Sequence, residues 1–103
     1  MAYNLIITER ADELLDHLAR HLILRLNNPQ AASHLFQSIE NIYHLLAENP
    51  YLFKECCDPI LKSKHYHEAP VSNMHYRIIY RIDKNTVYVL GIFHQLEDFQ
   101  NKL

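Results

Sequence analysis

The sequence predicts an α+β fold in which a small antiparallel sheet carries an N-terminal helical hairpin on one face, with the element order β-α-α-β-β-β. Three observations predict it. Two amphipathic segments, 9–26 and 29–48, follow each other almost without a connection, so they must fold back on each other. A short β-rich run, 2–8, precedes them. Two runs that alternate apolar and polar residues, 74–82 and 86–94, follow them and predict a β-hairpin.

Capping residues and helical spacing define the two helices. Thr8 is a suitable N-cap for the first, and its first turns are acidic. The letters "NNP" end that helix and begin the next, with Asn28 as N-cap and Pro29 at the first helical position; "ENP" ends the second near Asn49. The residues expected to be buried are Ala11, Leu14, Leu15, Leu18, Ala19, Leu22 and Leu26 in the first helix and Ala32, Leu35, Phe36, Ile39, Tyr43 and Leu46 in the second.

The second half is expected to supply three strands. Residues 51–63 show no clear period and are expected to be a connection, and "KHYHEAP" is a short strand ended by Pro70. The single glycine, Gly91, lies inside the last strand and suggests a bulge or a close backbone approach. No repeat or linker divides the 103 residues, so we expect one domain over 1–103.

Charge and cysteine content restrict the classes of function. The net charge is −2, which is unusual for a dedicated nucleic-acid binder, but it is unevenly spread. Residues 1–50 carry a net −3 and residues 60–85 a net +3, so an anion-binding face is expected in 60–85. The adjacent Cys56 and Cys57 match neither a zinc motif nor a disulfide framework. Without a signal peptide or long apolar run, we expect a reduced, cytoplasmic compartment and no membrane partner.

The register of the hairpin places the candidate site residues. A turn through Lys84 and Asn85 would pair Ile82 with Val87, and the apolar parity of the strand would face the helices. The further pairs would then be Arg81–Tyr88, Ile79–Leu90, Arg77–Ile92 and His75–His94. The open face would gather His75, Arg77, Arg81, Tyr88 and His94, with His65 and His67 nearby. A slip of one residue would move His94 to the core side.

This set of residues has a chemical interpretation. Cleavage of RNA by attack of the 2′-hydroxyl needs a base, a cation on the phosphate and an acid. Together, Arg77 as the cation and the flanking His75 and His94 as base and acid would supply all three functions, and no cofactor is required. Phosphate contacts would come from Lys62, Lys64, Arg81, His65, His67 and Tyr88. Two alternatives stay open: a solvated polar strand face, and a zinc site made by His65, His67, His75 and His94.

At "YRIIYRIDKNTVYVLGIFHQLEDF" the sequence resembles the RelE/ParE superfamily, the toxins of bacterial type II toxin–antitoxin (plasmid stabilisation) systems. The likeness extends over nearly the whole chain, including the "NNPQAA" helix break and the "ENP" helix end. It implies an antiparallel sheet with a helical hairpin, and a cognate antitoxin that binds the toxin as a hetero-oligomer. It also implies one of two activities. RelE-like toxins are ribosome-dependent mRNA endonucleases (mRNA interferases), and ParE-like toxins inhibit DNA gyrase.

The resemblance assigns roles to individual residues. Arg77 falls at the phosphate-binding arginine of RelE-like nucleases and His94 at a catalytic histidine, with Lys62 and Lys64 near their basic residues. Two features differ: Leu96 stands where many relatives have an arginine shortly after the histidine, and the chain is slightly acidic. Both features favour ParE-like inhibition or a weakened nuclease. The set of Arg77, His94, His75 and the two lysines nevertheless leads us to expect a toxin that cleaves mRNA on the ribosome without a metal, with gyrase inhibition as the alternative. A metal-binding or plain interaction domain is a third possibility.

Overall fold

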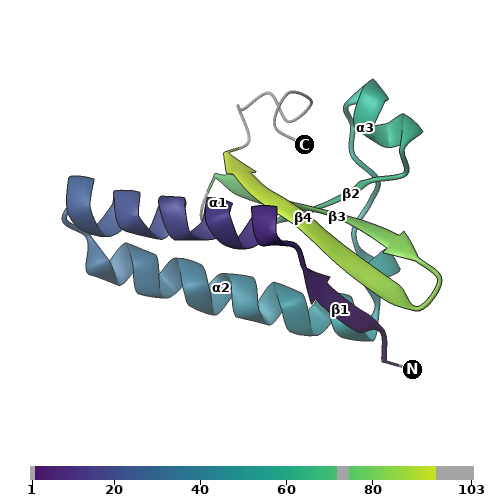
Figure 1. Ribbon diagram of the computed structural model, residues 1–103, viewed down its shortest axis with the longest axis horizontal. Coiled ribbons are helices and arrows are strands. Elements are labelled where there is room, and N and C mark those ends of the chain that lie inside the picture. The colour runs from purple at the N-terminus through teal and green to yellow at the C-terminus, as the bar shows by residue number, and fades with distance from the viewer. Residues whose placement is uncertain (1, 72–74, 95–103) are drawn as a thin grey trace.

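The computed structural model describes residues 2–71 and 75–94, and its α+β architecture is the one expected from the sequence. Its elements are β1 (Asn4–Ile7), α1 (Glu9–Arg20), a π-helical turn (His21–Arg25), α2 (Pro29–Glu48), a 3-10 turn (Pro50–Leu52), α3 (Pro59–Ser63), β2 (His67–Pro70), β3 (Tyr76–Asp83) and β4 (Thr86–His94). The strands form one sheet in the order β1-β4-β3-β2 (Figure 1). None of the helices in the described part of the chain is long and apolar enough to cross a membrane.

The sheet is mixed, whereas the sequence predicted an antiparallel one. β2 and β4 both pair antiparallel with β3, but β1 pairs parallel with β4, from Asn4 opposite Thr86 to Ile7 opposite Val89. A parallel neighbour requires a long crossover between the two strands. The helical hairpin together with β2 and β3 supplies this crossover, so β1 can return to the edge of the sheet beside β4.

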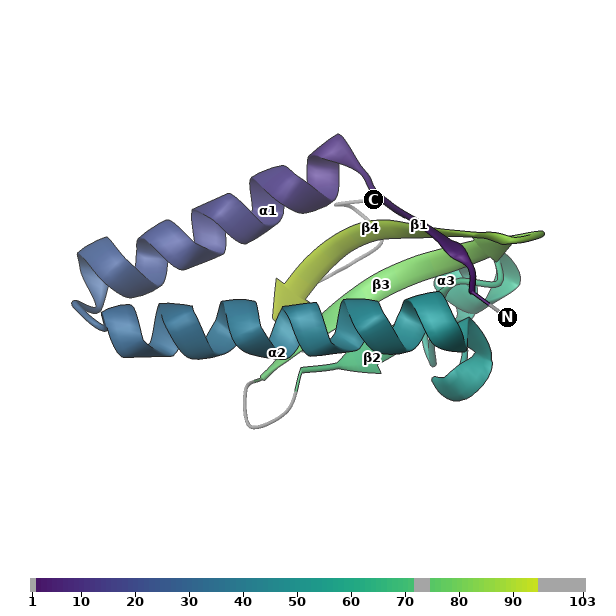
Figure 2. The same cartoon turned by 90° about the horizontal axis from the view of Figure 1, so that it is seen from below.

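The two helices begin at the expected caps. The Thr8 hydroxyl accepts a hydrogen bond from the Ala11 amide and donates one of 2.7 Å to the carbonyl of Val89, which fixes the start of α1 against β4. The Asn28 side chain accepts from the Ala31 amide at the start of α2. α1 and α2 form the expected hairpin, whose tip extends past the end of the sheet (Figures 1 and 2).

The main core lies between this hairpin and the sheet. The apolar stripe of α2 consists of Ala32, Leu35, Ile39, Ile42 and Leu46, and it packs on Ile78, Tyr80, Val87, Val89 and Ile92 of the sheet. Two of the expected buried positions are wrong. Phe36 is 46% exposed because it lies one residue off this stripe, where Ile42 completes the period instead. Leu26 is exposed because α1 ends in the π-helical turn before reaching it.

The sequence predicted that the sheet face opposite the helical hairpin would be open. In the structure the middle of this face is covered. Residues 51–63, expected to be a plain connection, contain α3, and the expected strand 64–70 begins only at His67. Figure 1 shows α3 on the side of the sheet away from α2. Leu61 of α3 packs with Cys56, Ile79 and Phe93 in a second apolar cluster. Ile79 would be exposed to water if this face were open. Packing of Leu61 against it removes its apolar surface from water and stabilises the fold.

A β-bulge in β4 changes the register of the hairpin. From the turn to Tyr80 opposite Val89 the pairing is the expected one, but Ile79 then lies opposite Gly91, so Leu90 is the additional residue. The bulge and close approach that Gly91 suggested are both confirmed. A Cβ atom at Gly91 would lie 2.7 Å from the Phe93 ring and 2.9 Å from the Leu14 side chain. Only glycine fits there without moving its neighbours.

Candidate functional site

The bulge places His94 on the helix side of the sheet. His94 lies opposite Tyr76 rather than His75, and its ring meets the Tyr76 ring edge to face at 5.6 Å. Together with His17 of α1 these side chains line a small cavity of about 200 Å³. The expectation that His94 shares the open face with Arg77 is wrong, because one additional residue in a strand reverses the face of every residue after it.

His75 remains close to His94 although the two are not paired. The centroids of their rings are 6.4 Å apart, and His75 is exposed just before β3. The end of the hairpin therefore brings the two imidazoles near each other, and His94 lies on the side of the sheet that Arg77 does not face.

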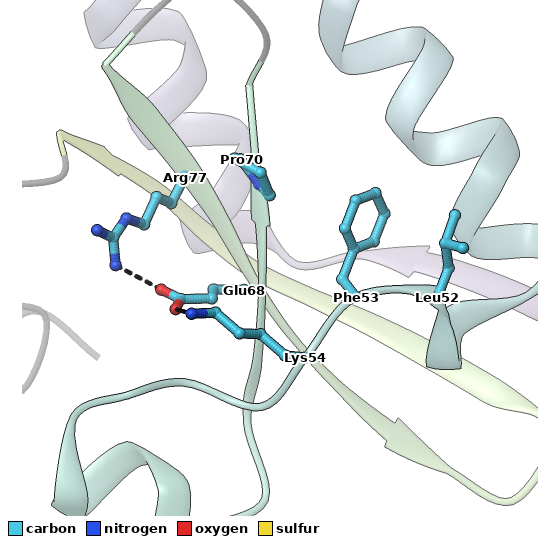
Figure 3. A pocket seen from close by; sticks show the side chains of 6 residues that line it. All are labelled: Leu52, Phe53, Lys54, Glu68, Pro70 and Arg77. Atoms are coloured by element: carbon cyan, nitrogen blue, oxygen red, sulfur yellow. Dashed lines mark hydrogen bonds and ion pairs between the residues drawn. The ribbon is translucent and has the colours of Figure 1, made fainter.

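Arg77 is held by a buried carboxylate. Its guanidinium Nη1 donates to Oε2 of Glu68 at 2.5 Å, and the Glu68 residue is only 5% exposed. The ammonium of Lys54 lies 3.8 Å from the other oxygen of Glu68. Figure 3 shows Arg77 and Lys54 pointing at Glu68 from opposite sides. A buried carboxylate is costly unless it is paired, so this arrangement commits part of the Arg77 fork to an internal partner.

The charged cluster lies in a cavity of about 500 Å³ with a partly apolar lining. Its apolar lining consists of Phe53 and Leu52, which lie together on one side in Figure 3, and of Pro70, which lies near Arg77. Lys54 also contacts the thiol of Cys57 at 3.3 Å, and this hydrogen bond is the main cause that raises the pKa of the Lys54 ammonium. Lys54 is therefore a cation at neutral pH.

Sequence reasoning did not identify Lys54 and Glu68. A signal for Glu68 was present: it is one of two carboxylates in the basic window 60–85, and it lies inside the expected strand 64–70 next to an alanine. A charge on a half-buried strand needs a cation, and Arg77 lies on the neighbouring strand diagonally opposite. Lys54 gave no comparable signal, because it lies in a segment without a period.

Two of the residues expected to contact phosphate are cross-strand partners, as the predicted register required. Arg81 lies opposite Tyr88, and its guanidinium carbon is 4.1 Å from the centroid of the Tyr88 ring. Lys62 and Lys64 are exposed at the end of α3, which covers this same face of the sheet through Leu61. The basic side chains of Arg77, Arg81 and the two lysines thus belong to one side of the sheet.

The two histidines among the expected phosphate contacts, His65 and His67, lie away from this set of basic side chains. His65 is exposed and contacts Glu55 at 3.0 Å. His67 stacks on Tyr80 at 5.3 Å and its Nδ1 lies 2.9 Å from the carbonyl of Phe53, so it belongs to the helix-side face. Because alternating positions and the bulge divide the histidines between two faces, no group of three metal-binding side chains forms among the residues that the structure describes.

Cys56 offers no nucleophile. Its side chain is buried in the second apolar cluster, and burial first, then the nearby Glu68 carboxylate, raise the pKa of the thiol to about 12. A thiol that stays protonated at neutral pH does not attack. The exposed Cys57 contacts Lys54, as described above.

Comparison with known families decides the assignment. The family model described as the ParE toxin of the type II toxin–antitoxin system parDE matches residues 5–99. The chain belongs to this family. It is thus a type II toxin of the RelE/ParE superfamily, as the sequence motifs indicated. A search of curated proteins gives no significant match.

Solved structures of this superfamily share the fold. The chromosomal ParDE system from P. aeruginosa superposes with a TM-score of 0.72 at 17% identity, covering 90% of this chain and 96% of the other. The toxin–antitoxin complex RelBE2 from Mycobacterium tuberculosis gives 0.61 at 21% identity, covering 94% and 95%. A mutant of the E. coli toxin RelE in the free state gives 0.65 at 18% identity, covering 93% and 86%. At such identities the likeness shows the fold alone, and both ParE and RelE relatives carry it.

The position of Leu96, which the resemblance singled out, lies outside the described residues.

Proposed function

We propose that this toxin acts in the cytoplasm as a ParE-like inhibitor of DNA gyrase and does not cut RNA. The observation that carries the proposal is the separation of Arg77 from His94, two of the three expected catalytic groups. Glu68 holds Arg77 on one face of the sheet, and the bulge puts His94 on the other. A base, an acid and a phosphate-binding cation must reach one phosphodiester together, so a division across two faces disfavours nuclease chemistry.

Charge supports the same proposal. A protein that enters the ribosome must neutralise many phosphates, and its affinity then depends on a large number of basic residues. This chain has a net charge of −2, and two of its cations, Arg77 and Lys54, surround an internal carboxylate. Gyrase inhibition by contact between two proteins does not require a strongly basic surface.

RelE-like cleavage remains the second candidate because of one observation. His75 and His94 lie 6.4 Å apart between ring centroids at the end of the hairpin, and His17 of α1 lines the same cavity as His94. Two imidazoles at this spacing are a possible acid–base pair for 2′-hydroxyl attack. The pair would have to take its phosphate-binding cation from outside this cavity.

Two assays with the same preparation decide between the candidates. We expect the purified toxin to stop DNA supercoiling by gyrase and to leave mRNA intact in a reconstituted translation reaction, as mapped by primer extension. His94→Ala should inhibit gyrase as the wild type does, and the exposed His44→Ala is the matched control. New mRNA ends that require ribosomes and disappear in His94→Ala would overturn the proposal in favour of the nuclease.

We also propose that a small antitoxin neutralises the chain in a hetero-oligomer. The support is the family itself and the toxin–antitoxin systems among its structural relatives. The product of a small reading frame next to the toxin gene should co-purify with this chain and restore growth. Failure to co-purify would count against the proposal.

A further inference from the structure

A groove joins α2 to the charged cluster. Two cavities, of about 330 Å³ and about 500 Å³, share Leu52, Phe53 and Pro70 as lining residues, so they adjoin each other. The smaller continues along α2, where Ser38, Asn41, Ile42 and Leu45 line it. The larger ends at Lys54, Glu68 and Arg77. In Figure 3, Leu52 and Phe53 lie on the α2 side of the charged residues.

The α2 end of the groove is apolar and exposed. Leu45 is 41% exposed and Leu52 is 56% exposed, and Pro70 is exposed beside them. Neighbouring apolar side chains that are exposed to water favour binding, because a partner that covers them removes apolar surface from water. The groove therefore favours a ligand with apolar side chains at this end.

The other end offers an exposed cation. The Lys54 side chain is 71% exposed, and its ammonium lies 3.8 Å from a Glu68 oxygen, while the other oxygen of Glu68 pairs with Arg77. A carboxylate arriving at Lys54 would complete an alternating arrangement of charges around Glu68. The chemistry of the groove thus changes along its length from apolar to anion-binding.

The main chain of β2 does not offer a free edge there. The Glu68 amide donates to the carbonyl of Lys54, and Glu55 forms a bridge with His67. Pro70, at the end of the strand, has no amide hydrogen to donate. A ligand would consequently be recognised through its side chains and not by adding a strand to the sheet.

We infer that this groove binds an extended segment of the antitoxin in which apolar residues are followed by an acidic residue. The apolar residues cover Leu45, Leu52 and Phe53, and the acidic residue reaches Lys54. The inference rests on the antitoxin partner named under the proposed function. Single-stranded RNA fits less well, because half of the groove is apolar and the charged half already contains Glu68.

The test uses selection from a random library of short displayed peptides on the immobilised toxin. We expect enrichment of peptides with apolar residues followed by Asp or Glu. Binding of the enriched peptides, measured by fluorescence anisotropy, should weaken at least about tenfold in Leu52→Asp and in Lys54→Glu. Leu24→Asp is the control, because Leu24 is also an exposed leucine, at 76% against 56% for Leu52, but lies at the tip of the helical hairpin; this variant should bind the peptides like the wild type.

Three results would overturn the inference: no enrichment, enriched peptides that lack acidic residues, or equal binding to the wild type and to both groove variants. Labelled oligouridine that binds in a Lys54-dependent manner and competes with the peptides would assign the groove to nucleic acid instead. Because peptide binding is measured with the toxin alone, its failure is read separately from failure of the antitoxin proposal, which co-purification tests, and from failure of the gyrase proposal.

Discussion

The hydroxyl of Tyr80 donates a hydrogen bond of 2.6 Å to the carbonyl oxygen of Pro50, a residue 30 positions earlier in the chain. Tyr80 is fully buried in the middle of β3, and Pro50 begins the 3-10 turn that follows α2. His67 of β2 stacks on the same ring. Burial raises the pKa of Tyr80 above its usual range, so the phenol remains a neutral donor. This bond joins the sheet to the turn that connects α2 with the segment containing α3.

Removal of this hydroxyl should destabilise the fold. Tyr80→Phe leaves the carbonyl of Pro50 without its donor in a buried place, which costs about 1–3 kcal/mol of the free energy of unfolding. Denaturation in urea measures the change. Tyr51→Phe, at an exposed tyrosine of the same turn, is the control and should change stability little. Equal midpoints for Tyr80→Phe and the wild type would contradict the role given to the bond.

The pair of Glu68 and Arg77 predicts a second effect on stability. Glu68→Gln removes the carboxylate and leaves the charge of Arg77 without that partner, so we expect a loss of up to about 3 kcal/mol; the partial exposure of Arg77 keeps the loss below that of a fully buried pair. Glu55→Gln, whose partner His65 is exposed, should cost less than about 1 kcal/mol. The double variant Glu68→Gln/Arg77→Gln should recover part of the loss. A double variant as unstable as the sum of both single ones would show that the two residues do not interact.

Local signals in the sequence predicted the elements well, and contacts between distant residues decided the rest. The caps at Thr8 and Asn28 are local, because each binds an amide three residues later, and both are confirmed. The register near the turn also held, from Ile82 opposite Val87 to Tyr80 opposite Val89. Hydrophobic period and turn chemistry are sufficient for features of this kind.

The candidate site depended on distant contacts, and only part of it could be predicted. Leu90 bulges where the packing of Phe93 and Leu14 requires a glycine at 91, and neither neighbour is visible from the strand pattern alone. That single residue moved His94 to the other face. Arg81 and Tyr88 lie between the turn and the bulge, where the register is unchanged, and they face each other as predicted.

The bulge itself predicts a third effect. Gly91→Ala would place a methyl group 2.7 Å from the Phe93 ring, which is buried and has little room to move, so we expect a loss of about 1–3 kcal/mol. Phe93→Leu shortens the side chain and should relieve the clash. In the double-mutant cycle, Gly91→Ala should cost less in the Phe93→Leu background than in the wild type. If the two losses were simply additive, the close approach would not be the reason for glycine at this position.

The buried thiol of Cys56 predicts how stability depends on alkaline pH. In the unfolded chain the thiol ionises near its ordinary value of 9.0, whereas burial raises its pKa in the folded chain to about 12. Below pH 9 both states keep the proton, so the contribution to stability is complete there. Between pH 9 and about 12 only the unfolded chain releases the proton, and the free energy of unfolding should fall by about 1.4 kcal/mol per pH unit from this group.

Urea denaturation at a series of pH values in the presence of a reductant measures this slope. Tyr43 adds to it in the same direction, because burial and then the charge of Asp12 raise its pKa to about 12. Cys56→Ala should flatten the curve between pH 9 and about 12 even though the variant is less stable at pH 7. The exposed Cys57→Ala keeps the buried thiol and should retain the slope of the wild type. Parallel curves for Cys56→Ala and the wild type would show that the Cys56 thiol ionises equally in the folded and unfolded chains.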